Sequence, residues 1–238
     1  MTIADPNAPL QQTRTIEFST VLASSVHDMK NSLCLLIQSI ENLSNKLEQK
    51  GAEEAQELAG IHYEASRLNS NLLQILALYR EDCDTLPLNI DEYYLDEILE
   101  ELVAKNELYI DNRKLNIEFE IEDELAWYFD NELVANLLND VFVNAMRYCK
   151  TSIKVKAFQQ GETLIVKILD DGAGYPENML DKLVPTPSTF NMTMSRTGLG
   201  LYFAQLIAAK HIQDGNVGKI QLENGGELDG SVFTLTLP

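Results

Sequence analysis

The N-terminal third of the chain carries two apolar stripes with the spacing of packed helices. In each stripe the apolar positions advance in alternating steps of four and three residues, which is the heptad pattern of a helix that packs along another helix. The first stripe consists of Leu22, Val26, Met29, Leu33, Leu36, Ile40, Leu43 and Leu47, and the second of Leu58, Ile61, Ala65, Leu68, Leu72, Ile75 and Tyr79. Lys50-Gly51 separates the two stripes, so the pattern predicts a helical hairpin.

The second stripe is wider than one neighbouring helix requires, because Leu73 and Leu76 extend it. Two helices alone bury little surface, and a wide apolar stripe needs partners on more than one side. Two paired hairpins would close such a core as a four-helix bundle. We therefore expect the hairpin to form a homodimer.

The pattern changes at Leu86-Pro87, where proline interrupts the helical spacing and predicts a domain boundary near residues 81–90. The elements expected beyond it are helices at about 91–110, 131–149 and 199–211, and strands at 115–121, 152–158, 163–169, 218–223 and 231–237. They predict an α/β sandwich with a mixed, largely antiparallel sheet and helices over one face. We thus expect a mobile tail at 1–14, the hairpin domain at 15–85 and the α/β domain at 86–238.

The amino-acid composition limits the kinds of binding partner and the cellular compartment that we expect for this protein. The chain has 37 acidic and 18 basic residues and a formal charge of −19, which argues against nucleic acid as a partner. No segment approaches the roughly 20 apolar residues that span a bilayer, and the N-terminus lacks the features of a signal peptide. Three scattered cysteines suggest neither a disulfide framework nor a zinc site. We expect a cytoplasmic protein without membrane insertion.

The first helix carries the segment His27-Asp28-Met29-Lys30-Asn31. His27 and Asn31 lie one turn apart beside the apolar stripe, so both are expected on an exposed flank. A neutral imidazole is a competent nucleophile toward phosphorus, and the adjacent carboxylate of Asp28 can orient the ring or accept its proton. Asn31 can position a water molecule, since an amide both donates and accepts hydrogen bonds. Taken alone, the segment equally fits an ordinary solvated helix face.

A second group of polar residues occupies the predicted helix at 131–149. Asp140 and Asn144 lie four residues apart and therefore share a face. A carboxylate and an amide one turn apart suit Mg²⁺, which takes oxygen ligands and shares its shell with phosphates and water. Arg147, Tyr148 and Lys150 follow closely, and the two cations could meet phosphate.

Two glycine-containing segments complete the candidate chemistry. Asp170-Asp171-Gly172-Ala173-Gly174 follows an apolar strand, and its glycines allow a tight turn and a close approach of the backbone to a ligand. Thr197-Gly198-Leu199-Gly200-Leu201 opens a helix, whose N-terminal amides favour phosphate.

These motifs, in this order, resemble those of two-component sensor histidine kinases, and the resemblance covers about residues 16–238. It implies a dimerisation and histidine phosphotransfer domain at 15–85 and a GHKL-type catalytic ATP-binding domain at 86–238. His27 would be the phosphoacceptor, with Asp28 and Asn31 assisting phosphorylation and dephosphorylation. Residues of the ATP site would be Asp140, Asn144, Arg147, Tyr148, Lys150, Asp170, Gly172, Gly174, Thr197, Gly198, Leu199, Gly200 and Leu201.

Within this resemblance Asn144 and Asp140 would bind Mg²⁺, and Asp170 would accept the adenine amino hydrogen of ATP. A response-regulator aspartate would receive the phosphoryl group. The chain departs from the family pattern at Ser32, where proline is usual, and at Asp140, where asparagine is usual. Residues 178–196 are expected to form a lid over the nucleotide. This segment is short, and it lacks a clear match to the phenylalanine motif of the family.

Two other functions fit parts of this pattern. A histidine phosphotransfer or scaffold protein with a degenerate ATP domain is favoured by Asp140, Ser32 and the short lid, but the complete glycine motifs oppose it. A protein-serine kinase of the anti-sigma type would use a similar ATP domain without needing His27. The resemblance identifies no sensor domain, so a separate sensor protein, the N-terminal tail or a longer parent chain would supply the input.

Overall fold

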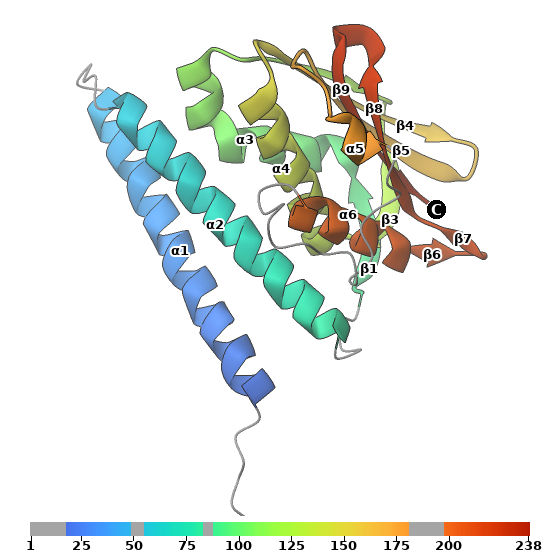
Figure 1. Cartoon of the computed structure of the whole chain (residues 1–238), viewed down its shortest axis with the longest axis horizontal. Coiled ribbons are helices and arrows are strands. Elements are labelled where there is room, and N and C mark those ends of the chain that lie inside the picture. The colour runs from blue at the N-terminus through green and yellow to red at the C-terminus, as the bar shows by residue number, and fades with distance from the viewer. Residues whose placement is uncertain (1–17, 49–54, 83–87, 181–197) are drawn as a thin grey trace, which may run out of the picture.

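The computed structural model describes residues 18–48, 55–82, 88–180 and 198–238. Helices α1 (Phe18–Glu48) and α2 (Ala55–Asp82) lie side by side as the predicted hairpin (Figure 1). The predicted tail, the Lys50-Gly51 link and most of the proposed lid lie outside the described residues. No helix in the described ranges is long and apolar enough to cross a membrane.

The apolar stripe of each hairpin helix divides into buried and exposed members. Val26 and Ile40 of α1 and Ala65 of α2 are buried. The stripe members that remain largely exposed are Met29, Leu36 and Leu43 on α1 and Ile61, Leu68 and Ile75 on α2. One copy of the chain therefore satisfies only part of the apolar surface that the heptad pattern provides.

The rest of the chain folds as an α/β sandwich. Its elements are β1 (Ile90–Tyr94), α3 (Leu95–Arg113), β2 (Asn116–Ile121), β3 (Ala126–Asp130), α4 (Asn131–Tyr148), β4 (Ser152–Gln160), β5 (Thr163–Asp170), α5 (Glu177–Leu180), α6 (Gly198–Lys210), β6 (Ile212–Gln213), β7 (Asn216–Val217), β8 (Lys219–Gly225), the 3₁₀ turn η3 (Gly226–Leu228) and β9 (Gly230–Leu237).

The five-stranded sheet has the order β2-β4-β5-β9-β8. Only β2 and β4 are parallel and the other neighbours are antiparallel, which confirms the predicted mixed sheet. Helices α3, α4 and α6 lie between this sheet and the hairpin (Figure 1). The aromatic side chains of the core are completely or almost completely buried, namely Phe129, Phe142, Phe203 and Phe233.

The helix predicted from residue 91 begins four residues later, at Leu95. Residues 90–94 form strand β1, which pairs antiparallel with β3, a strand that the sequence pattern did not predict. Asp91 and Glu92 have low strand propensity, and most of β1 is exposed. Its conformation therefore depends on pairing with a strand more than thirty residues later in the chain.

His211 joins the end of α6 to the start of α4. Its Nε2 accepts a hydrogen bond from the Asp130 N–H (3.0 Å), and its Nδ1 donates to the Ile207 carbonyl (2.8 Å). Burial lowers the pKa of His211, so the folded state favours the neutral ring. Stability from this group is complete above the ordinary pKa of about 6.5 and decreases as the pH falls below it.

We predict that a His211→Gln variant will lose this part of the pH dependence. Urea unfolding at pH 7.5 and 5.5 measures it as the change in unfolding free energy between the two conditions. The wild type is expected to lose more stability at the lower pH than the variant does. Equal losses of unfolding free energy in the two proteins would show that His211 does not take up a proton on unfolding.

Candidate functional site

The His27 segment lies on the exposed side of α1. His27, Asp28 and Asn31 are all exposed, as expected from their place beside the apolar stripe. The Ser32 hydroxyl donates to the Asp28 carbonyl at 2.9 Å, and α1 continues through this position without interruption. The imidazole is thus accessible to another domain or to a partner protein.

Asp170 ends β5 and organises the glycine-containing loop that follows. Its side chain is 2% exposed. One carboxylate oxygen accepts hydrogen bonds from the Gly172 N–H (2.7 Å) and the Ser231 N–H (3.3 Å), and the other is hydrogen-bonded to the Ser231 hydroxyl. This network holds the loop against the start of β9, sixty-one residues away in the chain.

Close backbone packing explains two of the glycines. A Cβ atom at Gly172 would lie 2.5 Å from the Tyr148 carbonyl oxygen, and one at Gly230 would lie 2.6 Å from the Gly172 nitrogen. Gly174 has a φ of +80°, a conformation that other residues rarely adopt. The loop is therefore built from main chain in close contact, with little room for side chains.

Asn224 and Tyr175 hold the far end of this loop. The Asn224 amide accepts from the Tyr175 N–H (2.6 Å) and donates to the Tyr175 carbonyl (2.8 Å). The Tyr175 side chain is hydrogen-bonded to Ser231, and burial raises the pKa of Tyr175 to about 12. Tyr175 is thus a neutral, fixed neighbour of the Asp170 network at physiological pH.

Asp140, on α4, is the most perturbed carboxylate of the candidate site. Burial raises its pKa to about 6, and a hydrogen bond from the Gln74 side chain of α2 partly offsets that rise. A Cβ atom at Gly200 would overlap the Asp140 carboxylate. Asp140 therefore lies where α2, α4 and the start of α6 meet. Asp140 and Asn144, one turn further along α4, are both partly exposed.

The basic and aromatic residues at the end of α4 make different contacts. The Arg147 guanidinium lies 5.4 Å from the centre of the exposed Tyr148 ring. Burial raises the pKa of Tyr63 on α2, and Arg147 partly offsets that rise, so Arg147 also lies near the hairpin. Lys150 is exposed, and its backbone N–H donates to Asp171 at 2.7 Å.

The second glycine segment opens α6. Gly198, Leu199, Gly200 and Leu201 form its first residues, and Thr197 lies outside the described residues. The unpaired amides and the dipole of a helix N-terminus favour an anionic ligand such as a phosphate. This end of α6 meets Asp140, so the carboxylate and the helix start border the same corner of the fold.

The donors at this corner fit Mg²⁺ better than a metal that is held by protein ligands alone. No group of three or more His, Cys, Asp or Glu side chains in the described ranges could hold a metal. Asp140 and Asn144 offer two oxygen ligands one turn apart, and Mg²⁺ usually completes its shell with phosphates and water.

The sequence pattern did not identify several residues that shape this site, namely Gln74, Asn224 and Tyr175. Gln74 is a polar residue between apolar stripe positions, and that was its only available signal. Ser231 follows Gly230 at the start of the last predicted strand, but its bond to Asp170 depends on the pairing of β5 with β9. Asn224 lies beside Gly225 and Gly226 in a segment that sequence alone describes only as a turn.

Comparison with known proteins agrees with this geometry. Residues 129–238 match the family model of histidine kinase-, DNA gyrase B- and HSP90-like ATPases. The chain is 24% identical over 225 residues to the sensor protein KdpD of Clostridium acetobutylicum, and 24% identical over 223 residues to the sensor protein SrrB of Staphylococcus aureus. These matches cover 92% and 91% of this chain but only 24% and 37% of the two relatives.

A solved structure gives the same picture for the α/β domain. The catalytic domain of the histidine kinase ThkA is 25% identical, with a TM-score of 0.53, and the match covers 63% of this chain and 96% of that one. A structure of ThkA in complex with the response regulator protein TrrA covers 93% of this chain and 64% of that one at 22% identity, with a TM-score of 0.56. That likeness shows a shared fold across both the hairpin and the α/β domain. These similarities support a catalytic domain of the GHKL sensor kinase type in the α/β part of the chain.

Proposed function

We propose that this chain is the kinase core of a two-component system, which phosphorylates His27 from Mg·ATP and passes the phosphoryl group to an aspartate of a response regulator. The observation that carries the proposal is the exposed His27 on a helical hairpin that is packed against an ATP-binding domain of the histidine kinase type.

The chemistry follows from the residues at each end of the transfer. A nitrogen of His27 attacks the γ-phosphorus, the bond to the bridging oxygen breaks, and ADP leaves. Asp28 orients the imidazole and stabilises the positive charge that develops on it. Asp170 binds the adenine amino group, and the first turn of α6 binds phosphate oxygens. Asn144, with Asp140, would hold Mg²⁺, which neutralises phosphate charge when it is bound.

A response regulator is the proposed acceptor because the ThkA structure of the same fold is a complex with the response regulator protein TrrA. The exposed flank of α1 leaves room for a receiver domain to approach His27. In the reverse direction, Asn31 would position a water molecule that hydrolyses the acyl phosphate on the regulator. Input would come from a separate sensor protein or from further domains, since the relatives are much longer than this chain.

Incubation with γ-labelled ATP, with and without Mg²⁺, tests the proposal. We expect labelling of the protein that requires Mg²⁺. A protein that is folded but binds no nucleotide would support the phosphotransfer or scaffold function instead. ATP binding without self-labelling, together with transfer to a serine of a partner, would support the serine kinase.

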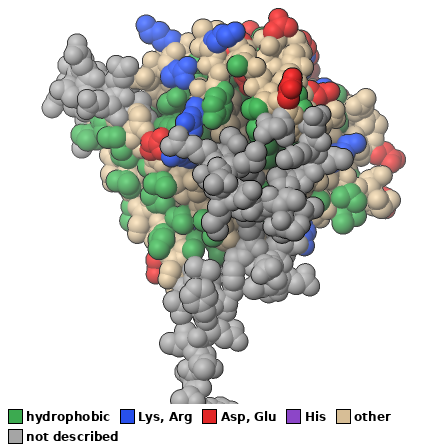
Figure 2. All heavy atoms as spheres, in the orientation of Figure 1, with side chains coloured by type: hydrophobic (Ala, Val, Ile, Leu, Met, Phe, Trp, Pro, Cys, Tyr) green, Lys and Arg blue, Asp and Glu red, His purple; other side chains and the backbone are tan. Residues whose placement is uncertain are grey.

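The exposed stripe members indicate that the hairpin pairs with a second copy. Hydrophobic side chains gather over the hairpin in the view of Figure 2. Met29, Leu36 and Leu43 keep the heptad spacing, and each is about half exposed. Covering them with the same stripes of a second hairpin completes a four-helix bundle.

We predict that Leu36→Glu will convert the dimer to a monomer. The change replaces an apolar contact with a buried charge in both copies, at a cost of about 4 kcal/mol or more per dimer. Analytical ultracentrifugation over a range of concentrations measures the dissociation constant. Leu35→Glu is the matched control, because the neighbouring Leu35 lies off the stripe and is 66% exposed. A Leu36→Glu variant that dimerises as tightly as this control would contradict the proposed interface.

A further inference from the structure

The hairpin packs against the catalytic domain mainly through α2, which contacts α3, α4 and α6. On α1, the Lys30 ammonium forms an ion pair with Glu132 at the start of α4 (3.2 Å). On α2, the Tyr63 ring stacks on Tyr109 of α3 with 4.7 Å between ring centres, and Gln74 is hydrogen-bonded to Asp140. Polar and aromatic side chains of both hairpin helices therefore contact the catalytic domain.

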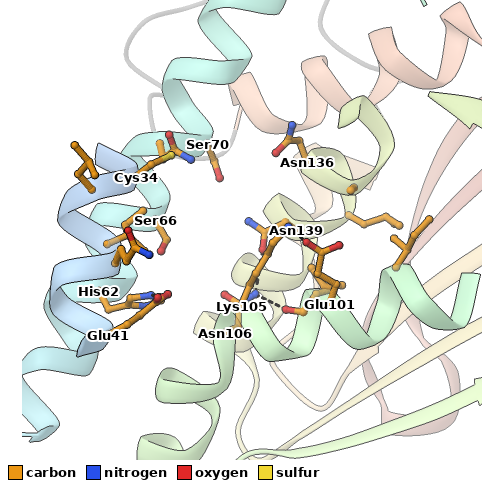
Figure 3. A pocket seen from close by; sticks show the side chains of 18 of the residues that line it. Cys34, Glu41, His62, Ser66, Ser70, Glu101, Lys105, Asn106, Asn136 and Asn139 are labelled. Atoms are coloured by element: carbon orange, nitrogen blue, oxygen red, sulfur yellow. Dashed lines mark hydrogen bonds and ion pairs between the residues drawn. The ribbon is translucent and has the colours of Figure 1, made fainter. Parts of the chain in front are cut away.

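Between these points the two parts enclose a cavity of about 700 Å³ with many polar side chains in its lining. Figure 3 shows Cys34 and Ser70 of the hairpin facing Asn136 and Asn139 of α4 across it. The Asn69 Oδ1 atom is buried at its edge without a hydrogen-bond partner in the described part of the chain. Polar side chains therefore line this part of the interface, whereas Tyr63 and Ala77 of α2 pack into the hydrophobic core of the catalytic domain.

Gln74 is one of the buried polar residues of this interface, with only 3% of its surface exposed. It donates a hydrogen bond to Asp140, and its Nε2 would lie 3.8 Å from a Cβ atom at Gly200. Gln74 thus fills the corner between α4 and the start of α6. It therefore occupies one hydrogen-bonding position of the Asp140 carboxylate on the hairpin side.

The contact between Gln74 and Asp140 lies near the level of His27 along the hairpin. The His62 Nε2 atom of α2 lies 3.1 Å from Glu41 of α1, which fixes the register of the two antiparallel helices. Following both helices from that contact places His27 on α1 opposite the part of α2 around Gln74. The catalytic domain is therefore docked at the level of the phosphoacceptor, but its Asp140 is bonded to the other helix.

We propose that Gln74 is a determinant of nucleotide affinity, because its hydrogen bond to Asp140 competes with Mg·ATP for that carboxylate. The inference rests on the proposed function, in which this domain binds Mg·ATP. The docked hairpin weakens nucleotide binding, and bound nucleotide weakens docking by the same factor, as linkage requires. Gln74 is a positioning residue, since it acts through Asp140.

Titration of the whole chain with a fluorescent ATP analogue and Mg²⁺ tests the inference. Gln74→Ala is expected to bind the nucleotide about fivefold or more tightly than the wild type. Gln74→Glu, which places a second carboxylate against Asp140, should act in the same direction. Gln38→Ala is the matched control, because Gln38 lines the cavity from α1 and is exposed. This variant should bind the ATP analogue with the same affinity as the wild type.

Hydrogen exchange supplies a readout that does not depend on activity. Mg·ATP is expected to increase amide exchange in the part of α2 around Gln74 in the wild type, and to change it little in Gln74→Ala. Unchanged or weaker nucleotide binding in both Gln74 variants, with binding by the wild type, overturns this inference alone. Absence of nucleotide binding in the wild type and every variant overturns the proposed function together with it.

Discussion

Replacing His27 with alanine is expected to reduce phosphoryl incorporation from Mg·ATP at least about a hundredfold, because the variant lacks the attacking nitrogen. His27 is exposed on α1, so its loss should change stability by no more than about 0.5 kcal/mol. Binding of ATP and dimerisation should therefore be retained. The measurement is the amount of label per protein after incubation with γ-labelled ATP.

The other histidines provide the control for this variant. His62→Gln is suitable, because glutamine can keep a hydrogen bond to Glu41 and the position lies on α2. This variant should incorporate phosphate at close to the wild-type level. Wild-type labelling of His27→Ala would place the phosphate elsewhere and contradict the assigned role of His27.

Replacing Asp170 with asparagine is expected to weaken ATP binding about a hundredfold or more. The carboxylate accepts hydrogen bonds from the Gly172 and Ser231 N–H groups and bonds to the Ser231 hydroxyl. An amide in the same place has one acceptor and directs an NH₂ group toward donors, which leaves buried groups unpaired. Isothermal titration with ATP measures the loss.

The same variant tests the proposed contact with adenine. A carboxylate accepts from the amino group of adenine, whereas an asparagine NH₂ can donate to the oxygen of guanine. The ratio of the affinity for ATP to that for GTP should therefore be smaller in Asp170→Asn than in the wild type. Asp229→Asn is the matched control, because Asp229 is exposed and asparagine tolerates its left-handed backbone (φ 60°). Full ATP affinity in Asp170→Asn would exclude Asp170 from the nucleotide site.

Much of the fold was predictable because its signals are local. The heptad steps of α1 and α2 and the apolar alternation of β4 and β5 are periodicities within single segments. The heptad pattern does not distinguish stripe members that pack within one chain, such as Ile40, from those left exposed, such as Leu36. The buried Val26 and Ile40 occupy one of the two apolar heptad positions, and the exposed Met29, Leu36 and Leu43 occupy the other. Both positions are apolar, so only the structure shows which one packs within a single chain.

The parts that sequence did not predict depend on distant residues. Strand β1 contains Asp91 and Glu92, and it forms because β3 pairs with it. The bond between Gln74 and Asp140 depends on how the hairpin lies against α4, which no spacing along the chain encodes. For the candidate site, residue types and motif order indicated Asp140 and Asp170, but their partners could come only from the tertiary arrangement.

The most direct test of the account is the chemistry of the phosphorylated wild-type protein. After incubation with γ-labelled ATP and Mg²⁺, the account predicts a phosphate that is labile in acid and stable in alkali, as expected for a bond to histidine nitrogen. Mass spectrometry under neutral conditions should locate it on the peptide that contains His27. An acid-stable phosphate on another residue, or no label in folded protein that binds ATP, would contradict the assignment of this chain as a histidine kinase core.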